Sequence, residues 1–283
     1  MFYSIWRYRV HVAAVLVAIT AVACGGGDGG GGGGTGAGGG SPPGTTPGTP
    51  PGTTPGSPPS ADASCGAYVP PVGTKYEFVV DIFNSAGKKT GFDTFTKGEI
   101  LPAITFNGNA GAFPFFSEVV NTPVVDDVAG TPKRPVIGKV FGGEDGTDSL
   151  AFGTEGTQTT GDGTETTTIT AVSTLTPPRK RPLNPIQDAV IKSTATSTVT
   201  AEGLGTISKE TSFEETFLGK EDITVPAGSF AGACKFKTTI TVGGTSSTSI
   251  TWQLPRQSQI VIQESFPDSG ITRKLASYKV TPP

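Results

Sequence analysis

The 283-residue chain predicts an all-β fold, an antiparallel meander that forms a barrel, a half-barrel or a sandwich. Three observations lead to this prediction. From residue 65 onward, short runs rich in Val, Ile, Thr and Phe alternate with Gly, Pro, Asn and Asp turns. Consecutive runs are joined by hairpin-type turns, and no long segment has the apolar spacing of a helix. A meander of this kind closes or folds over because open edge strands invite aggregation.

The individual strands follow from the alternation of apolar and polar residues. Two Thr- and Val-rich strands are expected at residues 166–175 and 191–201. One short helix is expected at residues 184–191, where Asn184 would cap it and Pro185 suits its first turn. Three hairpins are predicted: residues 76–83 with 91–97, 236–242 with 249–254, and 260–266 with 271–280.

The first 23 residues are predicted to be a signal peptide. Arg7 and Arg9 make the N-terminal region basic, and residues 12–23 form a 12-residue apolar run that ends on small residues. This run is too short to span a bilayer as a helix, which takes about 20 residues.

Cys24 follows the sequence Ala21-Val22-Ala23 directly. This stretch resembles the lipobox of bacterial lipoproteins, although that family most often has Leu where Ala21 stands. The resemblance implies that Cys24 carries a diacylglycerol and an N-acyl chain such as palmitate, which together hold a protein firmly on a membrane. Gly25, where Asp would imply inner-membrane retention, implies the outer membrane. An ordinary signal-peptidase site, which Ala-Val-Ala also fits, would instead give a secreted protein.

Residues 24–64 are expected to be a disordered tether between the anchor and a single β domain at residues 65–283. Residues 25–40 are nearly all Gly, and residues 42–57 hold two copies of an eight-residue unit of Pro, Gly and Thr. A Gly-rich chain behaves as a flexible coil, and the prolines stiffen it toward polyproline II, at about 3.1 Å per residue.

The chain contains three cysteines. If Cys24 carries lipid, Cys65 and Cys234 remain as a pair in an oxidising compartment. We predict that these two form a disulfide, which would close a very long loop. Two separate buried thiols are the alternative.

Composition excludes several kinds of function. Removal of residues 1–23 takes away His11, the only histidine, and leaves 19 basic and 24 acidic side chains, a net charge of −5. A protein with this net negative charge lacks the excess of basic residues that is typical of nucleic-acid-binding proteins. A Ser-His-Asp triad, a Cys-His dyad and a His-ligated metal all need a residue that the processed chain lacks. We therefore predict a protein that is not an enzyme and that has no metal or cofactor.

Three charged motifs were weighed as sites. Arg179, Lys180 and Arg181 are the one basic cluster, a candidate anion-binding site between two prolines, in what looks like a solvated loop. The acidic segment 143–148 is expected to be a turn, with a calcium loop as the alternative. Neighbouring carboxylates point to opposite faces of a strand, so such pairs are expected to be exposed charges. They are Asp126-Asp127, Glu214-Glu215 and Glu221-Asp222.

Aromatic residues gather at Phe113, Phe115 and Phe116. They are expected to pack in the core, with the lining of a lipid cavity as the alternative.

Residues 219–230, followed by Cys234 and Phe236, form the most distinctive stretch. It resembles a strand–turn–strand of uncharacterised bacterial envelope lipoproteins, with Pro226 and Gly228 at the positions that a type I turn favours. The resemblance implies fold class and localisation only.

Together these observations predict a lipid-anchored protein of the cell outer membrane that acts as a binding or interaction module. Its partners would be the membrane through Cys24, and other envelope proteins, lipopolysaccharide or the cell wall. A carrier of an apolar ligand is the alternative, and a carboxylate-dependent hydrolase is the third possibility.

Overall fold

The structure is a computed structural model that describes residues 65–66, 70–123, 135–161, 166–201, 203 and 205–283. The described residues form thirteen strands and no helix. Within these ranges there is accordingly no helix of the length and apolarity that crossing a membrane takes. The predicted all-β class is confirmed.

The strands take up most of the described chain and vary widely in length. They are β1 (Lys75–Phe83), β2 (Lys89–Ile100), β3 (Ile104–Phe106), β4 (Asn109–Pro123), β5 (Pro135–Glu144), β6 (Asp148–Gly161), β7 (Thr166–Pro182), β8 (Val190–Ala201), β9 (Gly205–Val225), β10 (Gly228–Val242), β11 (Thr245–Leu254), β12 (Gln257–Phe266) and β13 (Ile271–Thr281).

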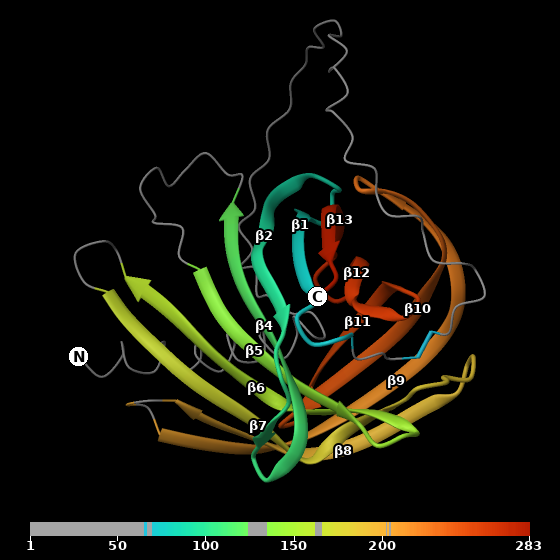
Figure 1. The fold of residues 1–283 in the computed structure, drawn as a ribbon. Helices are drawn as coiled ribbons and strands as arrows, with labels where there is room; N and C mark the ends of the chain where they lie inside the picture. The colour runs from blue at the N-terminus through green and yellow to red at the C-terminus, as the bar shows by residue number, and fades with distance from the viewer. Residues whose placement is uncertain (1–64, 67–69, 124–134, 162–165, 202, 204) are drawn as a thin grey trace, which may run out of the picture.

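The strands form one antiparallel meander that closes on itself (Figure 1). Sequence neighbours pair from β3 through to β13, and β13 then pairs with β1, which pairs with β2. The closing contact joins β2 to β4, from Gly91 opposite Pro123 to Ile100 opposite Phe115. Twelve strands thus make a closed barrel, while the short β3 pairs only with β4. Of the predicted shapes, the barrel is the one observed.

The three predicted hairpins are confirmed as β1–β2, β10–β11 and β12–β13. The strand–turn–strand at the β9–β10 junction is confirmed as well, because Gly228 pairs with Val225 and leaves Pro226 and Ala227 as the turn. Gly228 has a φ of 130°, which a residue with a side chain rarely adopts.

The predicted helix at residues 184–191 is wrong. Residues 184–189 form an irregular turn between β7 and β8, and residues 190–191 are the start of β8. The backbone N–H of Asp188 donates to the carbonyl of Phe217 on β9, at 2.8 Å. Asp188 also has a φ of 62°, in the left-handed region. The segment therefore satisfies its backbone against the barrel wall instead of along a helix.

The largest apolar core joins β1, the β9–β10 turn and β10–β13. Tyr76, Ile260, Ile262 and Leu275 are its most completely buried large side chains. Phe115 packs against this core with its ring edge-on to Tyr76, at 5.8 Å between centroids, as expected for a core aromatic. Phe113 is half-buried, and the side chain of Phe116 lies outside the described residues.

The wall formed by β6 to β11 has two chemically different faces. On β9, buried Phe213, Glu215 and Phe217 alternate with exposed or half-buried residues such as Glu214. Glu214 pairs with Lys192 of β8 on the outer face, where both side chains are largely exposed. Buried Phe213 and Phe217 instead pack with side chains of other strands. The face that carries Phe213, Glu215 and Phe217 is therefore the inner face of the barrel.

Candidate ligand site inside the barrel

The predicted disulfide between Cys65 and Cys234 is present, with Cα atoms 5.5 Å apart and a sequence separation of 169. Cys234 lies on β10 and is buried with Phe217 and Phe236, so the bridge holds Cys65 against the inner face. The chain is packed tightly here, because a Cβ on Gly66 would lie 1.4 Å from the carbonyl oxygen of Leu183.

The basic cluster is not a solvated loop. Arg179, Lys180 and Arg181 lie on β7, which extends to Pro182, so their side chains alternate between the two faces. Arg179 and Arg181 point inward and are mostly buried, whereas Lys180 lies outside with more than half of its side chain exposed. The three charges therefore do not form one patch.

Lys180 is bound by the turn that the sequence predicted at residues 143–148. Its Nζ lies 2.8 Å from a carboxylate oxygen of Asp145 and 3.8 Å from one of Asp148. The other oxygen of Asp145 accepts the backbone N–H groups of Thr147 and Asp148. The Lys180 hydrogen bond, followed by these backbone donors, holds the pKa of Asp145 well below its ordinary value. In the ranges that the structure describes, no group of three His, Cys, Asp or Glu side chains is placed to hold a metal.

Arg179 and Arg181 meet a single carboxylate inside the barrel, that of Glu215 on β9. One oxygen of Glu215 accepts from Arg179 at 2.8 Å, and Thr238 donates to the same oxygen at 3.3 Å. The other oxygen lies 2.9 Å from Nε of Arg181. Strand β8 separates β7 from β9 in the sheet, so these contacts reach across the concave face and not between paired strands.

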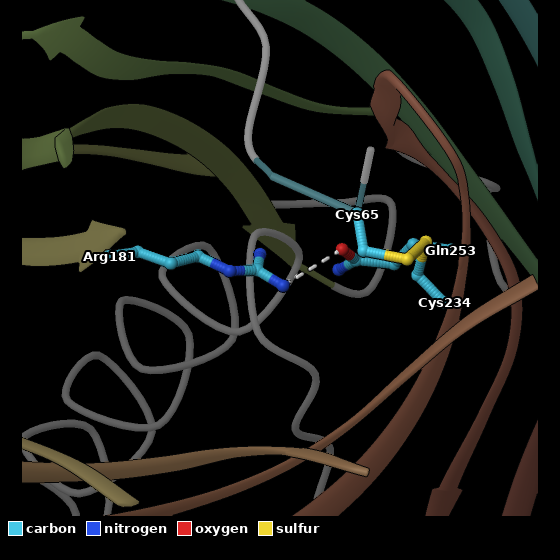
Figure 2. Close-up of a disulfide and its surroundings, with 4 residues drawn as sticks. All are labelled: Cys65, Arg181, Cys234 and Gln253. Atoms are coloured by element: carbon cyan, nitrogen blue, oxygen red, sulfur yellow. Dashed lines mark hydrogen bonds between the residues drawn. A yellow bond between two sulfur atoms is a disulfide. The ribbon is translucent and has the colours of Figure 1, made fainter. Parts of the chain in front are cut away.

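Arg181 also reaches further across the interior. A terminal nitrogen of its guanidinium donates to Oε1 of Gln253 on β11, at 3.3 Å (Figure 2). Its guanidinium carbon lies 3.8 Å from the ring centroid of Phe236, which fits a cation–π contact. Arg179 lies over the ring of Phe213 at 5.0 Å in the same way. Figure 2 shows Arg181 directed toward Gln253, beside the Cys65–Cys234 bridge.

Part of this network is not satisfied by hydrogen bonds. Nε of Arg181 and the facing oxygen of Glu215 are in ion-pair contact, but neither atom makes an aligned hydrogen bond within the described residues. We therefore take the contact as coulombic only. The hydroxyls of Thr154 on β6 and Thr211 on β9 are buried on the same inner face and also have no partner there.

A second buried carboxylate, Glu264 of β12, also belongs to the inner face. It pairs in register with Thr251 and Arg273, and its nearest charged contact is Nη1 of Arg273 at 3.8 Å. Burial raises the pKa of Glu264 to about 7, and the nearby Arg273 opposes this shift only in part.

The sequence analysis missed the buried partners. Glu214-Glu215 was expected to be an exposed pair, which is correct for Glu214 and wrong for Glu215. A signal was present, because Phe213 and Phe217 flank Glu215 at a spacing of two and place it on their face. Of the other pairs, Glu221 is largely exposed and paired with Lys235, and Asp222 accepts the backbone N–H of Gly232. Asp126 and Asp127 lie outside the described residues.

Comparisons with known proteins give no family for this chain. No protein-family model matches it, and no curated protein matches its sequence. Among solved structures, a candidate exported protein with a YmcC-like fold from Bacteroides fragilis is 12% identical, covers 76% of this chain and all of its own, and has a TM-score of 0.38.

Two further solved structures are similar at the same level. A candidate lipoprotein from Parabacteroides distasonis is 14% identical over 77% of this chain and all of its own, with a TM-score of 0.40. A beta-barrel-like protein with a domain of unknown function, from Brucella abortus, is 10% identical over 75% of this chain and 99% of its own, with a TM-score of 0.38.

Proposed function

We propose that this chain is a lipid-anchored protein of the bacterial outer membrane that works by binding, not by catalysis. In this proposal residues 1–23 are removed, Cys24 carries the lipid, and the barrel is the binding module at the end of the tether at residues 24–64. Its partner is another component of the envelope, of which protein, lipopolysaccharide and cell wall are the candidates.

The observation that supports binding most directly is the chemistry of the inner face. Arg179 and Arg181 of β7 and Glu215 of β9 are charged side chains that two strands of the barrel wall bring together. Each buried ion costs several kcal/mol in lost hydration, so such a group is a poor device for stability alone. A buried charged network with unpaired donors is better suited to recognise a polar group.

A hydrolase is less well supported. It would need two carboxylates that share one cleft, at least one of which has a raised pKa. Glu264 has a raised pKa, but its side chain is buried and its charged neighbour is Arg273. Glu215 is in contact with two guanidinium groups. Glu264 is thus paired with one arginine and Glu215 with two, and both carboxylates are buried.

Carriage of an apolar ligand is the second candidate. It is favoured by Phe213, Phe217 and Phe236, whose rings lie on the inner face. Because the same face carries the charges of Arg179, Arg181 and Glu215, a purely apolar ligand would place apolar surface against charged groups without offering them a hydrogen bond. A ligand with a polar group fits the interior better.

Membrane attachment is tested by fractionating cells that produce the wild-type chain or a Cys24→Ser variant. The proposal predicts that the wild type sediments with the outer membrane and carries acyl mass on the Cys24 peptide, whereas C24S is released. A wild-type Cys24 peptide of unmodified mass would contradict the anchor. Binding is then tested by short-range chemical cross-linking in intact cells, where the wild type should give a discrete adduct and C24S should lose it.

A further inference from the structure

We propose that the inner face of the barrel binds an oxyanion, the carboxylate or phosphate group of a small polar molecule, with Arg181 as its anchor. This inference rests on the proposed binding function and names the chemical class of the ligand.

The first support is the distribution of unsatisfied atoms. Four buried side-chain nitrogen or oxygen atoms lack a hydrogen-bond partner within the described residues: Thr154 Oγ1, Arg181 Nε, Thr211 Oγ1 and Glu215 Oε1. All four belong to the inner face of the wall formed by β6, β7 and β9. Arg181 Nε and Glu215 Oε1 face each other at 2.9 Å as an ion pair, whereas the hydroxyls of Thr154 and Thr211 have no hydrogen-bonding partner among the described residues. Native proteins pair the great majority of buried polar atoms, so these two hydroxyls indicate that a polar ligand or water completes this face.

The second support is the geometry of Arg181. Its Nε contacts Glu215 without an aligned hydrogen bond, and a terminal nitrogen donates to the neutral amide of Gln253 at 3.3 Å. A guanidinium presents five donors in a rigid plane that matches carboxylate and phosphate oxygens two at a time. The neutral amide oxygen of Gln253 is therefore a weaker acceptor for the terminal nitrogen of Arg181 than an incoming oxyanion would be.

Two neighbours hold the Arg181 side chain in place for this task. The ring of Phe236 lies 3.8 Å below the guanidinium carbon and fixes the plane of the group, while the donors at its edges stay in that plane. Glu215 is itself held by Arg179 and Thr238. Glu215 is therefore a positioning residue for Arg181.

The inner face is exposed to solvent near the start of β9. Along β9, Thr211 is buried, but Lys209 and Ile207, which continue the same face, are exposed, Ile207 by 49%. An anion that enters from this end would meet Lys209 first and Thr211 next. The side chains of Arg179 and Arg181 are 12% and 16% exposed, which suits a small group and not a bulky one.

The test is a titration of the purified full chain with sodium phosphate, and separately with sodium succinate, at constant ionic strength. Binding is followed by the proton–nitrogen NMR signals of the arginine Nε–H groups and by calorimetry. The signal of Arg181 is assigned as the one missing from Arg181→Gln. The inference predicts that this signal shifts as the anion binds and that R181Q lowers affinity about tenfold or more.

Two further variants keep the test informative. Lys180→Gln removes a positive charge from the adjacent position on the outer face, and it should change affinity less than about twofold. Thr211→Val keeps the shape of the side chain and removes its hydroxyl, which makes no hydrogen bond within the described residues. This variant should weaken anion binding by about two- to fivefold. If R181Q does not fold, Arg181→Lys replaces it, because lysine keeps the charge but loses the planar pair of donors.

Several results would overturn the inference. They are an Arg181 signal that neither anion shifts at millimolar concentration, an equal loss in K180Q and R181Q, or full affinity in both R181Q and T211V. Such a result, together with intact anchoring and cross-linking of the wild type, would remove the oxyanion site and leave the proposed function standing. Loss of anchoring and cross-linking would count against the proposed function instead.

Discussion

The replacement Glu264→Gln tests the electrostatics of the barrel interior. Glu264 is 6% exposed on β12, and it forms an ion pair with Arg273 at 3.8 Å. Burial raises the pKa of this carboxyl from 4.5 to about 7. Glutamine has nearly the same shape and cannot ionise, so the variant isolates the effect of the charge.

The sign and size of the effect follow from the two pKa values. Between pH 4.5 and 7 the unfolded chain has lost the Glu264 proton while the folded chain still holds it, so the folded state binds more protons. The free energy of unfolding contributed by Glu264 is therefore largest below pH 4.5 and declines as the pH rises toward 7. One pKa unit is worth about 1.4 kcal/mol, so the full decline is about 3 kcal/mol.

The assay is urea denaturation of both proteins between pH 4 and 8.5, with the disulfide intact. We compare the free energy of unfolding of E264Q with that of the wild type at each pH. This difference should shift in favour of E264Q by about 3 kcal/mol from the acidic to the alkaline end of the range. Glu214→Gln is the matched control, because Glu214 is an exposed glutamate of the outer face, and its difference from the wild type should stay within about 0.5 kcal/mol. A flat E264Q difference, or one that favours the wild type at alkaline pH, would mean that Arg273 outweighs burial and would refute the reasoning.

Two further predictions concern stability. The double variant Cys65→Ser with Cys234→Ser frees a loop of 169 residues, for which the chain-entropy model gives a loss of about 5 kcal/mol. Chemical denaturation measures this loss, and an unchanged denaturation midpoint would show that the bridge adds nothing to the fold. Ile262→Ala removes a fully buried side chain and should cost about 2 to 5 kcal/mol, whereas Ile207→Ala, at a half-exposed position, should cost less than about 1 kcal/mol. Equal midpoints for these two variants would contradict the assignment of the core.

The sequence predicts the hairpins well because their causes are local. Residues 76–83 alternate apolar and polar side chains, and Gly243-Gly244 supplies the positive φ values that a tight turn needs. Closure of the barrel through β2 and β4 is not local, since Gly91 and Pro123 meet from opposite ends of a long segment. No spacing rule in one sequence indicates that contact.

The helix expected at residues 184–191 shows a local signal overridden by tertiary structure. Asn184 and Pro185 are good helix-start residues, but the N–H of Asp188 finds its acceptor on β9 instead. The length of β7 was missed for the reverse reason. Pro177 and Pro178 cannot donate to a sheet and look like a loop, but a register shift opposite Ala151 and Gly153 of β6 accommodates them.

The candidate site was predicted in part. The sequence singled out Arg179 and Arg181, yet only the alternation of β7 shows that they face inward while Lys180 faces out. Gln253 carries no sequence signal at all, because three strands, β8 to β10, separate its strand from that of Arg181 in the sheet.

Native mass spectrometry of the full chain, extracted gently from its own membrane, tests the claim of a binding barrel most directly. The account predicts that the wild type releases a small molecule with a carboxylate or phosphate group, and that Arg181→Gln, isolated in the same way, releases none. A wild-type barrel that carries only an apolar lipid, or that holds nothing while Cys24 is acylated and the Cys65–Cys234 bridge is intact, would contradict it.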